Sequence, residues 1–290
     1  MEIIKKKKAK VQSNNIILVP TDFSEVCENA VRHTLQIAKY IDFKVYLLHV
    51  VNEDTIAYLE KNNLSKSILE DKLKEHVEKY KIEFSVPVDY IIKEGQLFKQ
   101  VQKAVSEIGA NMVVLGTHGK VGFQKITGSY ALKVISKTHV PTIVVQKKQL
   151  LEPYRNIVFP VTVSTQDRQK VNWAIYIAKT FRATVHIFPK RENEAYKKKK
   201  IMSVVKQIKI IFDKHNVKYV DQVSEEGAGN FSKQVLDYAV INDADLIMTM
   251  VTRGRFLPFF NRMDEQIIFN SSQIPVICIN PTDVKQVSWH

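Results

Sequence analysis

The sequence predicts an α/β protein made of two tandem doubly wound domains, each with a five-stranded parallel sheet. Short continuous apolar runs, typical of strands buried on both faces, alternate with stretches of helical periodicity. Such alternation gives a parallel sheet covered by helices on both sides. The alternation passes through five strands by residue 145 and then begins again, and 290 residues are enough for two ordinary domains.

The first predicted strand covers residues 16–19, where four apolar residues follow one another. It ends at Pro20-Thr21-Asp22. Ser24 can cap the helix that follows, because its hydroxyl can accept a free N–H of the first turn. Apolar residues at helical spacing support that helix as far as Ile41. The next apolar run predicts a strand at residues 44–51.

One long helix is predicted from about residue 54 to residue 81, with an apolar face of Ile56, Leu59, Ile68, Leu73, Val77 and Tyr80. A strand at 84–92 follows. Pro87 cannot donate to a ladder, so this strand should lie at an edge of the sheet or begin late. The remaining elements of the first half are a helix after Gly95, a strand at 112–115, a helix ending near residue 137 and a strand at 140–145.

The second half of the chain repeats the first. Residues 15–21, Asn-Ile-Ile-Leu-Val-Pro-Thr, recur at 156–162 as Asn-Ile-Val-Phe-Pro-Val-Thr, and Ile37-Ala-Lys39 recurs as Ile177-Ala-Lys179. Repetition over this length indicates a duplicated domain rather than a solenoid. We therefore expect a basic N-terminal extension at residues 1–13, one domain at 14–150 and a second domain at 151–290.

The stretch after residue 115 is rich in glycine. It reads Gly116-Thr117-His118-Gly119 and then Gly128-Ser129-Tyr130 at the start of a helix. Glycines let backbone N–H groups approach a ligand closely, and a helix N-terminus offers unpaired N–H donors with a partial positive charge. Both features suit a phosphate group, although the stretch is not a Walker A sequence. A plain connection between strand and helix is the alternative interpretation.

The duplication allows the two copies to be compared. Copy two retains most apolar strand positions but not the glycines, so the loop is not needed to fold this type of domain. This favours a ligand role in copy one. Near the first strand the apparent offset is 141 residues, so that Asp22 faces Val163. From residue 112 onward the offset is 134, and Gly116 faces Met250, Gly119 faces Arg253, Gly128 faces Arg262 and Ser129 faces Met263.

Three further motifs accompany the glycine loop: Val-Pro-Thr-Asp-Phe-Ser at residues 19–24, Leu-His-Val-Val at 48–51, and His139-Val-Pro141 before the last strand. Together they resemble the universal stress protein family. The family loop reads Gly-x2-Gly-x9-Gly-[Ser/Thr], and here the second gap is one residue short. The resemblance implies an adenine nucleotide alpha hydrolase-like fold with strand order 3-2-1-4-5 in each domain. The comparison of the copies predicts that the second domain is degenerate and lacks the glycine loop.

In nucleotide-binding members of the family, ATP or a related adenine nucleotide binds at the carboxyl ends of the strands, which the resemblance implies for the first domain. Asp22 matches the carboxylate near the adenosine half, and Val50 matches the position whose backbone faces adenine. Whether Mg²⁺ accompanies the nucleotide is left open. The residues assigned to the nucleotide are Pro20, Thr21, Asp22, Val50, Gly116, Thr117, Gly119, Gly128, Ser129 and Tyr130.

Some of these residues have a plainer interpretation. Asp22 could cap the helix that follows it, and Ser129 could act only as an N-cap. His118 is expected to belong to the loop without a catalytic role, and His49 to be a buried histidine with a hydrogen-bond partner. No nucleophile–base pair or metal cluster is evident beside the loop. We therefore predict no catalytic residue and no metal site, and at most weak ATP hydrolysis.

The net charge of +13 would suit nucleic acid, an acidic membrane surface or an anionic small ligand. Much of this charge lies in two lysine runs, Lys5 to Lys8 and Lys197 to Lys200, which we expect to be solvated. Neither run is interleaved with aromatic residues for base stacking, so no nucleic acid partner is expected. No apolar stretch is long enough for a membrane span, and two cysteines provide no disulfide framework, which favours the cytoplasm.

The sequence thus predicts a cytoplasmic stress-response sensor or regulator that binds an adenine nucleotide in domain one and acts through partner proteins. The alternative is a nucleotide-free tandem scaffold that works only by protein association. The apolar last strands, residues 142–145 and 276–279, would leave sticky edges in isolated domains. We expect the two domains to pair along these strands as an intramolecular pseudo-dimer, and a further homodimer is left open.

Overall fold

The computed structural model describes residues 14–117, 128–150, 152–224, 231–251 and 262–280. The basic extension, with the lysine run at residues 5–8, lies outside them. None of the helices within the described ranges combines the length and the apolar character needed to cross a membrane.

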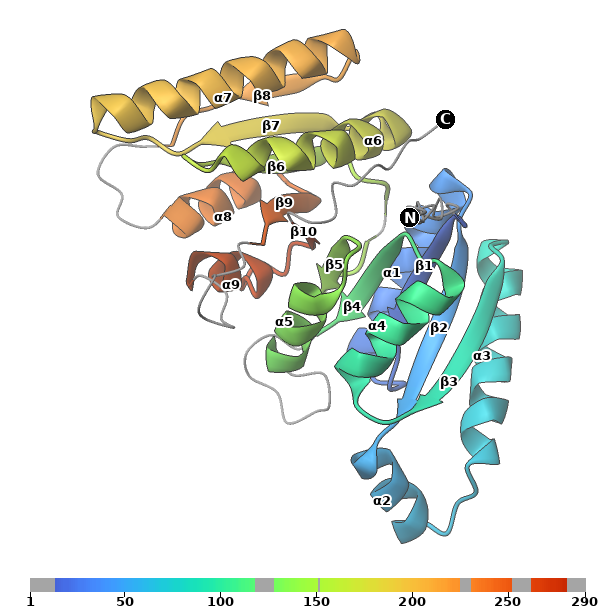
Figure 1. Cartoon of the computed structure of the whole chain (residues 1–290). Helices are drawn as coiled ribbons and strands as arrows, with labels where there is room; N and C mark the ends of the chain where they lie inside the picture. The colour runs from blue at the N-terminus through green and yellow to red at the C-terminus, as the bar shows by residue number, and fades with distance from the viewer. Residues whose placement is uncertain (1–13, 118–127, 151, 225–230, 252–261, 281–290) are drawn as a thin grey trace, which may run out of the picture.

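The first repeat contains a parallel sheet with strand order β3-β2-β1-β4-β5, which confirms the order 3-2-1-4-5. Helices cover both faces of the sheet, as expected for a doubly wound fold (Figure 1). Its elements are β1 (Ile16–Pro20), α1 (Glu25–Ile41), β2 (Lys44–Val51), α2 (Glu53–Lys61), α3 (Ser67–Phe84), β3 (Val88–Glu94), α4 (Leu97–Ile108), β4 (Met112–Gly116), α5 (Gly128–Lys137) and β5 (Thr142–Val145).

The second repeat has the same arrangement, with strand order β8-β7-β6-β9-β10. It differs at the start of its first helix, where a 3-10 turn, η1, precedes the α-helix. Its elements are β6 (Asn156–Val161), η1 (Thr165–Lys170), α6 (Val171–Phe181), β7 (Thr184–Pro189), α7 (Ala195–Lys214), β8 (Tyr219–Asp221), α8 (Phe231–Ile241), β9 (Leu246–Met250), α9 (Arg262–Ile268) and β10 (Val276–Ile279).

The last strands of the two repeats, β5 and β10, pair antiparallel, with Val144 opposite Val276 and Thr142 opposite Cys278. Every other strand pair in the described residues is parallel. The pairing joins both repeats into one ten-stranded sheet, with β5 and β10 at its centre (Figure 1). The edges that isolated repeats would expose are therefore covered.

Apolar side chains form two layers, one on each face of this sheet. Alternate residues of β1 enter different layers: Ile17 and Val19 pack with residues of α1 and α3, whereas Ile16 and Leu18 pack with residues of α4 and α5. Each layer contains residues of both repeats. The two repeats consequently share their hydrophobic cores across the β5–β10 pair.

The single long helix predicted for residues 54–81 is wrong, because the structure has two helices, α2 and α3, with a break at residues 62–66. Asn63 in the break has φ of 49°, a left-handed conformation that asparagine tolerates better than most residues. Ile68, assigned to the apolar face, is 42% exposed. The helical period restarts after the break, so residues on either side of it do not share one face.

The strand predicted for residues 84–92 begins later, at Val88, because α3 continues to Phe84. Pro87 lies just before β3, and β3 is an edge strand of the sheet. Both expectations drawn from this proline are thus confirmed. Its carbonyl still accepts the Val45 N–H at 2.9 Å, which fixes the start of the β2–β3 ladder.

The sequence offset of 141 near the first strand is also wrong. Ile17 of β1 pairs with Met112 of β4, and Ile157 of β6 pairs with Leu246 of β9, so that Ile17 corresponds to Ile157. The structural offset there is 140 residues. A shift of one residue moves every side chain of a strand to the opposite face of the sheet. Ile17 and Ile157 lie in the same layer of the core, which agrees with an offset of 140 residues. Asp22 therefore corresponds to Thr162, not to Val163.

Two side-chain amides lie at opposite ends of the β5–β10 pair. Gln146 Nε2 donates to Asn270 O at 2.9 Å, and Asn280 Nδ2 donates to Ile135 O and Thr138 O at 2.6 and 2.9 Å. Gln146 and Asn280 follow their strands at equivalent positions. The two repeats thus use the same kind of contact toward each other, as in a pseudo-twofold arrangement.

Replacing Asn280 by alanine is expected to lower the free energy of unfolding by about 2 kcal/mol, because two buried carbonyls lose their shared donor. Urea denaturation at equilibrium measures the change. Asn242→Ala is the matched control, since Asn242 directly follows α8 and its Nδ2 donates to Tyr238 O of that helix at 2.8 Å. An equal loss in both variants would contradict a special role of Asn280 between the repeats.

A second contact between the repeats involves His33 of α1 and Tyr154, which lies between β5 and β6. His33 Nε2 and the Tyr154 hydroxyl are 2.6 Å apart, and both residues are buried. The Tyr154 ring also packs edge-on against Phe181 of α6, with ring centroids 5.2 Å apart. Through this tyrosine, α1 and α6 are held together over the centre of the sheet.

Candidate functional site

The carboxyl ends of β1, β2 and β4 meet at one edge of the first repeat. β1 lies between β2 and β4, and the chain crosses to opposite sides of β1 to form these two strands. Open α/β sheets bind ligands in the crevice at such a switch point. At this place Thr21 and Thr117 are buried, whereas Asp22 and Phe23 are half-buried.

The turn after β1 contains a strained residue. Phe23 has φ of 64°, a left-handed conformation that is rare for a bulky aromatic residue. Two hydrogen bonds hold the turn: Phe23 N–H donates to Thr21 Oγ1 at 3.1 Å, and Ser24 N–H donates to Asp22 Oδ1 at 3.0 Å. Strain of this kind persists where the surroundings enforce it, and it occurs preferentially at functional sites. The corresponding residue of the second repeat, Val163, has no such conformation.

Asp22 does not cap the following helix. Ser24 is the N-cap of α1, as predicted, and its hydroxyl oxygen accepts the Cys27 N–H at 3.5 Å. Burial alone would raise the pKa of the Asp22 carboxyl, but hydrogen bonds from Ser24 outweigh it and hold the pKa below its ordinary value. At neutral pH the Asp22 carboxylate is therefore ionised and can only accept hydrogen bonds.

The Phe23 ring anchors this turn to two neighbouring elements. It stacks on His49 of β2 with ring centroids 4.8 Å apart, and the Lys72 ammonium of α3 lies 4.3 Å from its centroid. Such a cation–π contact contributes about 0.5–1 kcal/mol at a partly exposed site. The turn that carries Asp22 is consequently fixed in place by contacts outside its own segment.

His49 ends the regular pairing between β1 and β2. Its Nδ1 donates to Thr21 O at 2.8 Å, and the β1–β2 ladder stops at Pro20 and Leu48. Because successive peptide groups of a strand face opposite sides and the Leu48 carbonyl bonds to Thr21, the peptide groups of Val50 face the same side. They are directed past the end of β1, toward the crevice. The Val50 side chain is buried.

In the second repeat a backbone hydrogen bond forms at the position equivalent to Val50. Lys190 corresponds to Val50, and its N–H donates to Val161 O at 2.8 Å. That carbonyl corresponds to Thr21 O, which accepts a hydrogen bond from the His49 ring in the first repeat. The pairing of β6 with β7 accordingly continues as far as Val161 and Pro189. The two repeats therefore differ at this carbonyl, because it accepts the Lys190 N–H in the second repeat and the His49 ring in the first.

Gly116, at the end of β4, serves the packing of α1. A Cβ atom at this position would lie 2.5 Å from Val26 O and 3.1 Å from Cys27 Cα, so any side chain would displace the first turn of α1. The second repeat has Met250 here, and its helix starts with the 3-10 turn η1. The close packing of α1 thus requires a glycine at position 116, in addition to the ligand role assigned to this residue.

The remaining predicted residues are placed as follows. Thr117 is buried, and its N–H donates to Val145 O at 2.9 Å, which extends the β4–β5 ladder. Gly128 and Ser129 begin α5, whereas Gly119 lies outside the described residues. Tyr130 is 39% exposed, and its ring centroid is 5.3 Å from the Lys133 ammonium of the same helix.

Comparison with known proteins gives the family. The profile described as "Universal stress protein family" matches residues 13–146. "Universal stress protein MJ0531" of Methanocaldococcus jannaschii is 32% identical over 139 residues, which cover 45% of this chain and 81% of the relative. This chain belongs to the universal stress protein family. A second relative of that organism, "Universal stress protein MJ0577", is 31% identical over 153 residues, covering 46% of this chain and 94% of the relative.

Solved structures share the fold over both repeats. A universal stress protein from Archaeoglobus fulgidus superimposes with a TM-score of 0.75 at 18% identity, covering 92% of this chain and 99% of that one. The functionally unknown protein PA1789 from Pseudomonas aeruginosa superimposes with a TM-score of 0.64 at 13% identity, covering 94% of this chain and 95% of that one. The two-repeat architecture of this universal stress protein therefore occurs in other chains of similar length.

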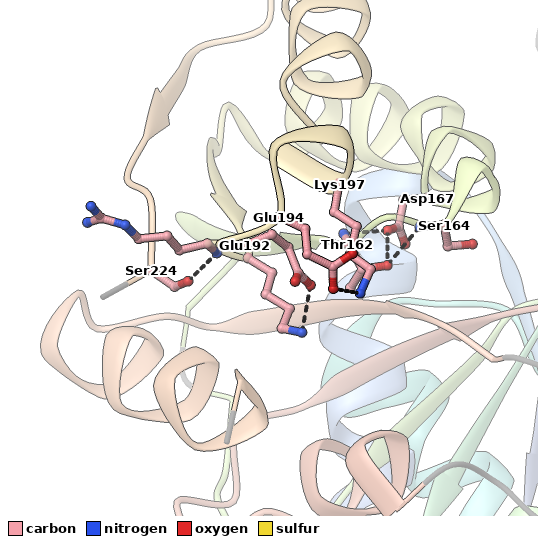
Figure 2. A network of polar contacts seen from close by, with 9 residues as sticks. Thr162, Ser164, Asp167, Glu192, Glu194, Lys197 and Ser224 are labelled. Atoms are coloured by element: carbon pink, nitrogen blue, oxygen red, sulfur yellow. Dashed lines mark hydrogen bonds and ion pairs between the residues drawn. The ribbon is translucent and has the colours of Figure 1, made fainter. Parts of the chain in front are cut away.

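In this universal stress protein, side chains fill the carboxyl end of β6. Thr162 donates to Asp167 Oδ2 through its N–H and its hydroxyl, at 2.7 and 2.8 Å (Figure 2). Lys170 Nζ lies 3.4 Å from Asp167 Oδ1 and also donates to Pro160 O. Lys170 and Asp167 are only 1% and 5% exposed. A buried ion pair thus occupies the second repeat where the first has its strained turn.

Other polar groups at this edge of the second repeat also pair with one another. Arg191 N–H donates to Ser224 Oγ at 2.7 Å, and the Lys190 ammonium lies 2.7 Å from a Glu192 oxygen (Figure 2). No group of three or more His, Cys, Asp or Glu side chains within the described ranges is placed to hold a metal ion. These polar groups at the edge of the second repeat therefore bond to neighbours within the same repeat.

Sequence reasoning missed Phe23 and Lys170. The left-handed conformation of Phe23 has no sequence signal, because an aromatic residue does not favour it. Lys170 could have been found by aligning the copies at an offset of 140, which places this lysine opposite Ala30, an apolar core position of α1. A lysine at such a position indicates either a buried ion pair or a ligand contact.

Proposed function

We propose that the first repeat binds ATP or a related adenine nucleotide at the carboxyl ends of β1, β2 and β4. The observation that carries the proposal is the contrast between Val50 and Lys190. The Lys190 N–H bonds to a strand carbonyl, whereas His49 takes the equivalent carbonyl and leaves the Val50 peptide groups directed into the crevice. A peptide N–H and C=O beside buried apolar side chains suit the flat edge of adenine, which carries donors and acceptors.

The other residues of the site fit the rest of such a ligand. The ionised carboxylate of Asp22 can accept hydrogen bonds from ribose hydroxyls. The glycine-rich stretch leads into α5, and the N-terminus of a ten-residue helix offers N–H donors for phosphate oxygens. Gly128 and Ser129 stand at that N-terminus. A bound nucleotide would supply the negative charge that these donors favour.

In the cell, we propose that this protein acts as a cytoplasmic stress-response sensor or regulator. A nucleotide that binds only the folded state stabilises it by an amount that depends on nucleotide concentration. It shifts the protein toward conformations that bind it best, and partner proteins can distinguish these. No step of the proposal requires a chemical reaction of the nucleotide.

ATP is expected to raise the melting temperature of the purified protein by about 3 °C or more at 100 times Kd. Asp22→Asn keeps the oxygen that accepts the Ser24 N–H but removes the charge, so it should weaken binding about tenfold. His49→Leu frees Thr21 O for the Val50 N–H and should abolish the shift. Thermal unfolding with and without ATP measures both effects, and assay of the denatured protein reveals carried-over nucleotide.

The controls are chosen from the second repeat. Asp237→Asn changes an exposed carboxylate of α8, and His186→Leu removes a buried histidine from β7, the strand equivalent to β2. Both variants should keep the ATP shift. If the unchanged protein shows no shift and carries no nucleotide, a nucleotide-free tandem scaffold replaces the proposal. If Asp237→Asn weakens binding as much as Asp22→Asn, the site lies elsewhere.

A further inference from the structure

A groove of about 330 Å³ lies between η1 and α7 on the second repeat, away from the proposed nucleotide site. Its volume is at the lower end of the range of small-ligand pockets, about 300–1,000 Å³. Three of the side chains that line it are cationic, namely Arg168, Lys199 and Lys200, and none is acidic. Two lysines of the run at residues 197–200, Lys199 and Lys200, line the groove, and neither belongs to the proposed nucleotide site.

The cationic side chains come from two elements and face one space. Along α7, Tyr196, Lys199, Lys200 and Ser203 recur at intervals of three and four residues, which places them on one side of the helix. Arg168 approaches from η1. Its Nη1 donates to Gln207 Oε1 at 2.6 Å, so the guanidinium is held against α7 rather than extended into solvent.

Carboxylates do not neutralise this groove. Asp167, the acidic residue of η1, is buried against Lys170, and Glu194 pairs with Lys197 just outside the lining (Figure 2). Lys199 and Lys200 form no ion pair with any residue that the structure describes. The charges of Lys199 and Lys200 are consequently available to a ligand.

From these contacts we propose that the groove binds a small molecule with two or more phosphate groups. The guanidinium of Arg168 matches the geometry of phosphate oxygens, and Lys200 adds a compact charge beside it. Hydroxyls of Tyr196 and Ser203 can donate to further oxygens. The small volume and the single aromatic side chain favour a compact polyphosphate over a nucleic acid, whose recognition uses a long basic track with several stacking rings.

Inorganic triphosphate is the probe, titrated into the full chain by calorimetry at low and at physiological salt. Arg168→Gln and Lys200→Gln are each expected to weaken Kd about tenfold, since each removes a charge-assisted contact. The matched control is Lys206→Gln, an exposed lysine of the same helix outside the lining, which should change Kd by less than about twofold. Gly119→Val, a substitution in the glycine-rich stretch of the first repeat, should retain the binding that depends on Arg168.

Three results would overturn the proposal. The first is no binding of triphosphate to the unchanged protein at either salt concentration. The second is an equal loss of affinity in Lys206→Gln and Lys200→Gln, which would indicate attraction by net charge alone. The third is a single-stranded RNA oligonucleotide that displaces triphosphate and binds more tightly in a manner dependent on Arg168, which would assign the groove to nucleic acid.

Discussion

Lys170→Ala should lower the free energy of unfolding by about 3–5 kcal/mol, because it leaves a buried carboxylate without its cation. The change leaves the Asp167 carboxylate buried, with hydrogen bonds from the N–H and the hydroxyl of Thr162 but no cation beside it. It also removes the donor to Pro160 O and the cation that lies 4.4 Å from the Phe159 ring centroid. An uncompensated buried charge costs more than the pair itself contributes.

Urea denaturation of the unchanged protein and of Lys170→Ala measures this loss. Lys197→Ala is the matched control, because Lys197 also pairs with an acidic residue three positions away, Glu194, but at an exposed site. It should cost less than about 1 kcal/mol. The double variant Lys170→Met with Asp167→Asn removes both charges and should be more stable than Lys170→Ala. Equal losses for Lys170→Ala and Lys197→Ala would show that burial of the ion pair does not affect the free energy of unfolding.

Acidification should destabilise the protein through His33, whose pKa is lowered to about 3 by burial. In the unfolded chain a histidine has its ordinary pKa of about 6.5. The stability that comes from keeping His33 neutral is thus fully present above about pH 6.5 and is lost as the pH falls toward 3. Over the middle of this window the unfolded state binds one proton more, so the slope is about 1.4 kcal/mol per pH unit.

The measurement is the free energy of unfolding at several pH values between 7.5 and 4.5, for the unchanged protein and for His33→Gln. Glutamine can still bond to the Tyr154 hydroxyl, so the variant changes mainly the titration. His186, whose pKa burial also lowers, is present in both proteins and cancels in the comparison. Parallel curves for His33→Gln and the unchanged protein would contradict the role of His33.

The strands could be predicted from the sequence, because apolar runs and the residues just after them are local signals. The strand order was implied by the resemblance to the universal stress protein family. The run at residues 16–19 and the motif Pro20-Thr21-Asp22 place the end of β1, and the family strand order puts that end at the switch point. The family relationship has a similar basis, since it rests on short motifs at strand ends. These signals do not depend on how distant segments pack.

Features that depend on distant contacts could not be predicted. Asn63 breaks the long helical pattern through a left-handed conformation that the pattern does not reveal. The register of β6 follows from its pairing with β9, and sequence identity at Asn15 and Asn156 suggested a shift of one residue. The close approach of Val26 to Gly116 likewise appears only when α1 is packed on β4. A glycine assigned to ligand binding by motif thus also has a packing role.

The pairing of β5 with β10 within one chain makes the association of the repeats independent of protein concentration. Residues 146–155 tether the two halves, and a short tether gives an effective concentration on the order of millimolar, so dilution does not separate them. A symmetric homodimer carries every substitution twice, whereas a tandem chain carries it once. The second repeat could therefore acquire Met250 and the buried pair of Lys170 and Asp167, while the first repeat kept Gly116 and the strained turn at Phe23.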